Sequence, residues 1–264
     1  MTKALKSHHR RRKRLGQHFL HDPNIIDRII RAIAPQPGQR VVEIGPGHGA
    51  LTVPLIKHLG ALDVIEVDRD LASSLDTHCL ELGALRIHAV DALNFDICSL
   101  AKDSECLRVV GNLPYHISTP LLFHLLRHSA CISDMVLMFQ KEVVDRLAAE
   151  PGSPAYGRLS VMAQYHCSVE PYFTVGPGAF SPPPKVDSAI VRLVPHKEPP
   201  VKIYDEAQFS NLVRQAFAHR RKTLRNSLKA LLSETQIREA GVDPGVRADT
   251  LSLDSFAELA NAVK

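Results

Sequence analysis

The sequence predicts an α/β fold, in which a mostly parallel sheet is covered by helices on both faces and is followed by a small helical domain. Apolar runs of strand length alternate with amphipathic runs of helix length from residue 40 to about residue 194. The strand runs contain few polar breaks, which indicates strands buried on both faces, as in a parallel sheet. Beyond residue 200 the pattern is helical to the end.

The first part of this pattern predicts five strands separated by helices. The expected strands are 40–45, 63–68, 86–90, 107–113 and 134–139. The expected helices are 50–58, 71–82 and 120–128. A parallel pair needs a crossover connection, commonly a helix, so this alternation supports parallel pairing.

After residue 139 the pattern changes. Helices are expected at 142–149 and 158–166, and then two β-rich runs at 169–175 and 188–194, which we expect to pair as an antiparallel hairpin at the edge of the sheet. Three further helical segments are expected at 205–218, 222–232 and 255–263. The Pro-rich stretch 195–200 is typical of a linker, and it divides the chain into domains 1–198 and 199–264.

Positive charge is concentrated in two segments of this 264-residue chain, whose net charge is +4. Residues 1–14 contain seven Lys or Arg, residues 214–229 contain six, and neither segment contains an acid. Each run alone is compatible with a solvated tail or helix face, but the two together favour a nucleic-acid partner. The expected RNA-binding residues, with the second group on the first two helices of the C-terminal domain, are Arg10, Arg11, Arg12, Arg220, Arg221, Lys222 and Arg225.

Several protein classes are disfavoured. No apolar run approaches the roughly 18 residues of a membrane span, and no apolar h-region follows the basic N-terminus, so we expect a cytoplasmic protein without a membrane partner. The five cysteines are scattered and form no C-x-x-C pair, so we expect buried, reduced thiols rather than a disulfide framework or a zinc site. His124 and His128 share a helical face without a nearby acidic ligand, so no metal is expected.

A glycine-rich loop follows the first strand. Gly45, Gly47 and Gly49 allow a tight turn and a close approach of the backbone to a ligand at the start of the next helix. This G-x-G-x-G spacing is one residue short of the dinucleotide fingerprint, and with an acid in front of it the loop suits a ligand that lacks a pyrophosphate. Glu66 and Asp91 end the next two strands, where they would accept hydrogen bonds from ribose hydroxyls and from an adenine amine. Alternatively, Glu66 is a solvated strand end and Asp91 caps the next segment.

The fourth strand runs into the stretch VGNLPYHIS, residues 110–118. Pro114 fixes a corner and keeps Leu113 extended, which directs the Asn112 side chain and the Leu113 or Pro114 carbonyl into one pocket beside the Tyr115 ring. Two acceptors and an aromatic wall suit a planar base with an exocyclic amine, because they stabilise the positive charge that develops when the amine attacks. Tyr115 would stack on a base turned out of its helix or loop.

These motifs resemble those of a known family. The NLPY stretch after a GPGHG loop resembles the amino-methyltransferase motif of S-adenosylmethionine enzymes. Three further stretches, 13–20, 139–143 and 180–189, are similar to the rRNA adenine N6-dimethyltransferases, above all the bacterial 16S rRNA branch, whose loss gives kasugamycin resistance. The resemblance implies a class I methyltransferase fold with a seven-stranded sheet. It also implies S-adenosylmethionine as cofactor and dimethylation of two adjacent adenines in the 3′-terminal hairpin loop of 16S rRNA, in an assembling 30S subunit.

The resemblance also assigns roles to residues of this chain. It implies a catalytic group made of Asn112, Leu113, Pro114, Tyr115 and Phe180. The cofactor positions it implies are His18, Leu20, Gly45, Gly47, Glu66, Asp91 and Asn112. His18 departs from the bacterial motif, which usually has Asn at this position, and this leaves its contact open. Phe180 is expected to close on the target base; without the resemblance, a packed loop anchor would be expected.

Three alternatives remain at this point. A nicotinamide dehydrogenase fits the glycine loop and Glu66 but leaves NLPY and both basic segments unexplained. A 23S rRNA methyltransferase shares the mechanism, and substrate preference between the ribosomal subunits would distinguish it. A non-catalytic ribosome-assembly factor would bind the subunit without using the pocket. Nothing in the sequence indicates an obligate interface between subunits, so a monomer is expected.

Overall fold

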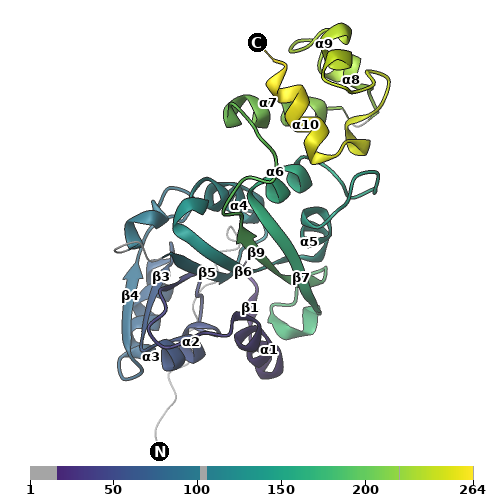
Figure 1. Cartoon of the computed structure of the whole chain (residues 1–264). Coiled ribbons are helices and arrows are strands. Elements are labelled where there is room, and N and C mark those ends of the chain that lie inside the picture. Colours follow the sequence, from purple (N-terminus) through teal and green to yellow (C-terminus); the bar gives the residue numbers. More distant parts are fainter. Residues whose placement is uncertain (1–16, 102–105, 220, 264) are drawn as a thin grey trace, which may run out of the picture.

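A computed structural model describes residues 17–101, 106–219 and 221–263. Its centre is a seven-stranded sheet in which the first five strands are parallel and the last two are antiparallel to their neighbours (Figure 1). The order across the sheet is β4 (Ala84–His88), β3 (Ala61–Ile65), β2 (Val41–Ile44), β5 (Leu107–Asn112), β6 (Ile132–Gln140), β9 (Ser188–Pro195) and β7 (Cys167–Val175). The predicted α/β class and the hairpin at the sheet edge are confirmed.

Helices cover both faces of the sheet, and side chains alternate between the two cores. On β5, Leu107 and Val109 join one cluster of buried residues, whereas Val110 joins the other. The first cluster is closed by α4 (Ser118–Arg127), α5 (Lys141–Leu147) and α6 (Arg158–His166). The second is closed by α1 (Pro23–Ile33), α2 (Thr52–Leu59) and α3 (Arg69–Cys79).

A helical part lies at one end of the molecule, drawn from green to yellow in Figure 1. It contains α7 (Glu206–Ala216), α8 (Leu224–Ser227), α9 (Glu234–Glu239) and α10 (Leu253–Asn261). Its core is a third cluster, centred on Phe209 and Phe256, which also includes Met162 and Tyr165 of α6. The division of the chain at residues 198 and 199 stays a prediction.

Two α-helices and two strands were not predicted from the sequence. Helix α1 begins where the Asp22 side chain accepts hydrogen bonds from two backbone N–H groups, with Pro23 in the first turn. Helix α9 begins with a capping box formed by Ser233 and Gln236. The short strands β1 (Phe19–Leu20) and β8 (Phe180–Ser181) pair with each other over two residues, which is too short for a periodic signal.

The helix predicted at 222–232 is wrong in length. Within that range α8 covers only Leu224–Ser227. Thr223 instead forms a bridge with Arg247, and the Leu224 N–H donates to the carbonyl of Val246. These tertiary bonds satisfy backbone groups at the start of α8 that have no partner within the helix, so they fix where α8 begins.

The expectation for the cysteines is wrong for three of the five. Cys98 and Cys131 form a disulfide, because the 3-10 turns that precede β5 and β6 lie side by side although 33 residues separate them in sequence. Cys106 is a free thiol but is exposed. Cys79 and Cys167 are free and buried, as expected. Among the described residues, no helix has the length and apolar character needed to cross a membrane.

Candidate active site

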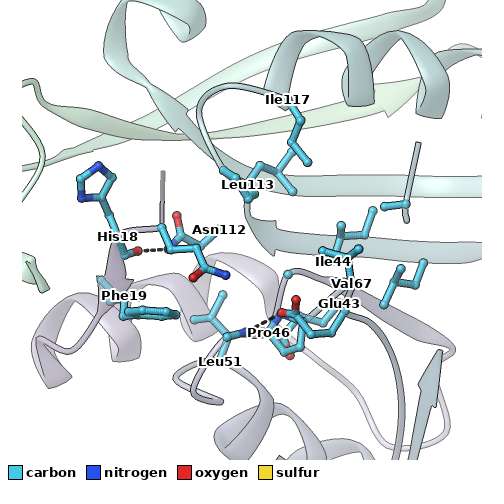
Figure 2. Close-up of a pocket in the computed structure, with 18 of the residues that line it drawn as sticks. His18, Phe19, Glu43, Ile44, Pro46, Leu51, Val67, Asn112, Leu113 and Ile117 are labelled. Carbon is cyan, nitrogen blue, oxygen red and sulfur yellow. Dashed lines mark hydrogen bonds between the residues drawn. The ribbon is translucent and has the colours of Figure 1, made fainter. Parts of the chain in front are cut away.

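A pocket lies at the carboxyl ends of β2, β3, β4 and β5, where open α/β sheets bind ligands. The sheet brings together sites that are far apart in sequence, and the chain before α1 adds another wall (Figure 2). The predicted residues that line this pocket are His18, Leu20, Gly45, Gly47, Glu66, Asp91, Asn112, Leu113, Pro114 and Tyr115. Phe180 does not line it.

The glycine loop turns tightly beneath the β1 segment. Gly47 has φ of 55°, in the left-handed region that favours glycine. A Cβ atom at Gly47 would lie 3.0 Å from Cδ1 of Phe19, so a larger residue would collide with that ring. The Phe19 ring also packs against His48, with ring centroids 4.1 Å apart. The loop and the β1 segment are therefore fitted to each other.

Glu66 is 5% exposed and anchored at the pocket wall. Its carboxylate accepts hydrogen bonds from the backbone N–H of Asp68 at 2.9 Å and of Gly47 at 3.4 Å. Burial raises the pKa of this carboxyl, and the two backbone donors oppose that shift. The remaining lone pairs of Glu66 are available to ligand hydroxyls.

Asp91 occupies a position that is compatible with both of its predicted roles. It lines the pocket, and its carboxylate also accepts a hydrogen bond from the Leu93 N–H at 3.0 Å and one from the Asn94 amide at 3.3 Å. Capping of the turn after β4 and a place in the pocket are therefore compatible. A carboxylate has about four acceptor sites, so the cap leaves capacity for a ligand amine.

Glu43 is a pocket residue to which the sequence assigned no role beyond an acid in front of the glycine loop. It is 1% exposed, on β2, and accepts a hydrogen bond from the Thr52 hydroxyl at 2.6 Å. Burial, with a contribution from the nearby charge of Glu66, raises the pKa of Glu43 to about 8, although the Thr52 bond opposes this. Glu43 is therefore mainly neutral at pH 7. The sequence signal that could have indicated this buried acid is its position within an apolar strand run.

The Asn112 side chain is fixed by the segment before β1. Its Nδ2 donates to the backbone carbonyl of His18 at 3.1 Å (Figure 2). This bond fixes the orientation of the amide, and it leaves Oδ1 as the acceptor that a ligand can use. The contact of residue 18 with Asn112 is thus made by backbone, which a histidine supplies as well as an asparagine does.

The structure distinguishes the two carbonyls that the sequence left open. The Pro114 carbonyl accepts a hydrogen bond from the Ile117 N–H at 3.1 Å, within the turn before α4. Among the described residues, nothing donates to the Leu113 carbonyl. Leu113 is therefore the better candidate for the second acceptor beside Asn112.

Tyr115 has contacts at its hydroxyl and beside its ring. Its hydroxyl lies 2.6 Å from the hydroxyl of Ser188 on β9, and its ring centroid lies 5.3 Å from that of His18. Burial raises the pKa of the Tyr115 phenol, so the hydroxyl keeps its proton at neutral pH. The His18 Nδ1–H in turn donates to the Pro182 carbonyl at 2.7 Å.

Phe180 is not in the position that the resemblance implied. It is 2% exposed and belongs to the core cluster closed by α1, α2 and α3, while its backbone pairs with Leu20. The packed loop anchor, which the residue pattern alone favoured, describes this arrangement. The correction has a local cause, since the β1–β8 pairing directs Phe180 into the core.

The basic residues form a different kind of surface. Arg221 and Lys222 are exposed in the turn after α7, and Arg225 is exposed on α8. The second basic group therefore lies mainly in a connection rather than on two helices, which corrects the prediction. Arg10, Arg11, Arg12 and Arg220 lie outside the described residues.

A family model described as Ribosomal RNA adenine dimethylase matches residues 8–264. The chain belongs to the ribosomal RNA adenine dimethylase family. This adenine dimethylase is 57% identical over 253 residues to Ribosomal RNA small subunit methyltransferase A of Pseudomonas aeruginosa, covering 96% of this chain and 94% of the relative. It is 55% identical over 251 residues to the protein of the same name from Nitrosococcus oceani, covering 95% of each.

Solved structures of similar shape agree with this assignment. A dimethyladenosine transferase from Plasmodium falciparum matches this adenine dimethylase with a TM-score of 0.74 and 28% identity, over 92% of this chain and 96% of that chain. The 23S rRNA methyltransferase ErmE matches with a TM-score of 0.69 and 26% identity, over 93% and 99%. The predicted methyltransferase fold and family are confirmed, and the dehydrogenase alternative is set aside.

Proposed function

We propose that this adenine dimethylase transfers methyl groups from S-adenosylmethionine to N6 of two adjacent adenines in the 3′-terminal hairpin loop of 16S rRNA. The substrate is the small subunit during its assembly. The single observation that carries this proposal is the Asn112 amide, fixed by the His18 carbonyl beside the free Leu113 carbonyl, at the rim of the glycine-loop pocket.

The pocket residues fit an adenosine-type cofactor. Glu66 presents a carboxylate with spare lone pairs at the end of β3, where ribose hydroxyls would bind. Asp91 presents a carboxylate after β4, where it would accept a hydrogen bond from the adenine amine. Gly47 adds no side chain to the loop, and a Cβ atom there would lie 3.0 Å from the Phe19 ring. When bound, S-adenosylmethionine would supply a methyl group on a sulfonium, whose carbon a nitrogen lone pair can attack while S-adenosylhomocysteine leaves.

The acceptors at the rim would act on the target amine. The lone pair of N6 is delocalised into the adenine ring, so the free amine is a poor nucleophile. Asn112 Oδ1 and the Leu113 carbonyl would accept hydrogen bonds from its two N–H groups and stabilise the positive charge that develops as the N–C bond forms. The nitrogen would then lose a proton to solvent. A second transfer would need a second S-adenosylmethionine in exchange for S-adenosylhomocysteine, and the amine would then offer one remaining N–H to the two acceptors. Holding the amine in line with the methyl group is the main contribution of the protein.

The relatives favour the small subunit over the large one as substrate. Relatives at 55% and 57% identity carry the name Ribosomal RNA small subunit methyltransferase A, whereas the 23S rRNA methyltransferase ErmE is 26% identical. The exposed Arg221, Lys222 and Arg225 would bind RNA phosphates and place the hairpin at the pocket.

Labelled S-adenosylmethionine tests this proposal. The enzyme is incubated with undermethylated small subunits, with large subunits in parallel, and with Asn112→Ala as the catalytic control. We expect dimethyladenine in small-subunit rRNA only, and a loss of at least about a hundredfold in rate for Asn112→Ala. Label in large-subunit rRNA would assign the chain to the 23S rRNA branch. Tight subunit binding without label would identify an assembly factor with an unused pocket.

A further inference from the structure

The segment from Phe180 to Ser188 lies behind the pocket rather than in it. Phe180, Pro182 and Ser188 are not among the lining residues. The segment nevertheless pairs through its backbone with Phe19 and Leu20 and forms hydrogen bonds to the side chains of two further lining residues. The Pro182 carbonyl accepts a hydrogen bond from the His18 ring, and the Ser188 hydroxyl forms a hydrogen bond with the Tyr115 hydroxyl. The segment therefore supports the pocket wall from outside, which is a role that the resemblance did not give it.

Ser188 is a fixed point in the fold. It is 0% exposed, at the start of β9, and it is paired on one side with Gln140 of β6 and on the other with Val175 of β7. A residue bracketed by two strands has little freedom to move, so its hydroxyl is a rigid partner. Tyr115, in contrast, lies in a turn between β5 and α4, outside any helix or strand.

The Tyr115–Ser188 bond is therefore the contact that fixes the far end of the ring. The two oxygens are 2.6 Å apart, a distance typical of a well-formed bond between hydroxyls. The neighbouring His18 ring, 5.3 Å away at 33°, borders the ring without bonding to its hydroxyl. Without Ser188, the Tyr115 side chain would have more rotational freedom in the turn and its hydroxyl would lose its partner.

We propose that Ser188 is a positioning residue of this adenine dimethylase, whose hydroxyl holds the Tyr115 ring in the orientation that stacks on the target adenine. The inference rests on the proposed function. Preorganising the ring avoids an ordering cost when the RNA base enters. Because Ser188 lies outside the pocket lining, it acts on the base through Tyr115 and leaves the cofactor positions unchanged.

A double-mutant cycle tests this role. Ser188→Ala removes one hydroxyl, Tyr115→Phe removes the other while keeping the ring, and the third variant combines them. The measurements are kcat/KM for undermethylated small subunits and calorimetric binding of S-adenosylmethionine. We expect each single variant to lower kcat/KM about tenfold with cofactor affinity unchanged, and the double variant to be no worse than the weaker single variant, because both remove the same bond.

Two further variants separate positioning from packing. Ser188→Cys keeps the size of the side chain but replaces the hydroxyl by a weak donor, so we expect it to match Ser188→Ala. Ser160→Ala removes another fully buried hydroxyl, which donates to the Arg146 carbonyl on α5, away from the pocket. We expect it to lower the Tm without changing kcat/KM.

Three results would overturn the inference. One is a double variant whose loss is the product of the single losses, which would mean that the hydroxyls act independently. Another is a Ser188→Ala or Ser188→Cys enzyme with wild-type kcat/KM and only a lowered Tm. Both leave the proposed function intact, because the wild type still methylates small subunits. An inactive wild type would overturn the proposed function and this inference together.

Discussion

The pocket and the basic segment 214–229 are built in opposite ways. In the pocket, Glu43, Glu66 and Asn112 have their side chains fixed by partners at 2.6–3.4 Å, and the two acids are almost fully buried. In the basic segment, Arg221 and Lys222 are exposed in a turn. None of the ion pairs found among the described residues involves either of them.

This difference teaches how each region responds to change. A preorganised, buried site depends on single atoms, because removing one partner leaves another polar group unsatisfied. An exposed cationic surface depends on the sum of several screened charges, so each residue contributes a small and salt-dependent share. The predictions below test this contrast, from the largest expected effect to the smallest.

The largest effect concerns the pH dependence of stability through Glu43. Its pKa is about 8 in the folded chain and near its ordinary value of 4.5 in the unfolded chain. Between these values the folded state holds a proton that the unfolded state has lost, so the stabilisation present below pH 4.5 is lost as pH rises to 8. The slope approaches about 1.4 kcal/mol per pH unit.

Denaturant unfolding of wild type and Glu43→Gln from pH 5 to 8 measures this slope. The glutamine does not titrate, so the free energy of unfolding of the variant lacks this pH-dependent component. The difference in free energy of unfolding between the two proteins should therefore change steadily across the range. A constant difference would show that Glu43 is ionised in the folded state, which would contradict the conclusion that it is a buried neutral acid.

Cofactor binding distinguishes the two acids of the pocket. We expect Glu66→Gln to weaken the binding of S-adenosylmethionine about tenfold, because an acceptor of hydroxyl hydrogen bonds loses its charge. Glu43→Gln is the matched control, and at pH 7 it should bind nearly as the wild type does, since Glu43 is already mainly neutral. Titration calorimetry at pH 7 gives both affinities. Equal losses in the two variants would contradict the separate roles.

The smallest effect per residue is expected in the basic segment. Arg221→Gln, Lys222→Gln and Arg225→Gln together should weaken subunit binding several-fold and reduce the salt slope by about one for each lost phosphate contact. Arg238→Gln, at an exposed arginine of α9, serves as control. Filter binding across a salt series measures both quantities. An unchanged slope would remove this segment from the RNA footprint.

The sequence predicted the pocket well because its residues end neighbouring parallel strands. Gly45, Glu66, Asp91 and Asn112 each follow a strand run, so the sheet necessarily gathers them at one edge. Contacts made by segments remote in sequence were not predictable in this way. Ser188 and Tyr115, whose hydroxyls are hydrogen-bonded, are 73 residues apart in the sequence, and no periodic pattern predicts such a contact.

The fold shows the same division. Most strands and long helices were predicted, although the eleven-residue helix α1 was not. Helix α9, which has six residues and begins at a capping box, was also missed. The Cys98–Cys131 disulfide likewise depends on two turns meeting in space. For Phe180, the motif predicted a contact with the target base, but the pairing of the two-residue strands β1 and β8 directs its side chain into the core.

The central claim is that the pocket catalyses methyl transfer and that the basic segment binds RNA. Methyl transfer and subunit binding, measured in parallel for Asn112→Ala and for the Arg221, Lys222 and Arg225 triple variant, test it most directly. The account predicts that Asn112→Ala loses transfer and keeps binding, and that the triple variant binds weakly but regains the wild-type kcat at saturating subunits. Equal loss of binding in both variants, or a triple variant whose kcat stays low, would contradict it.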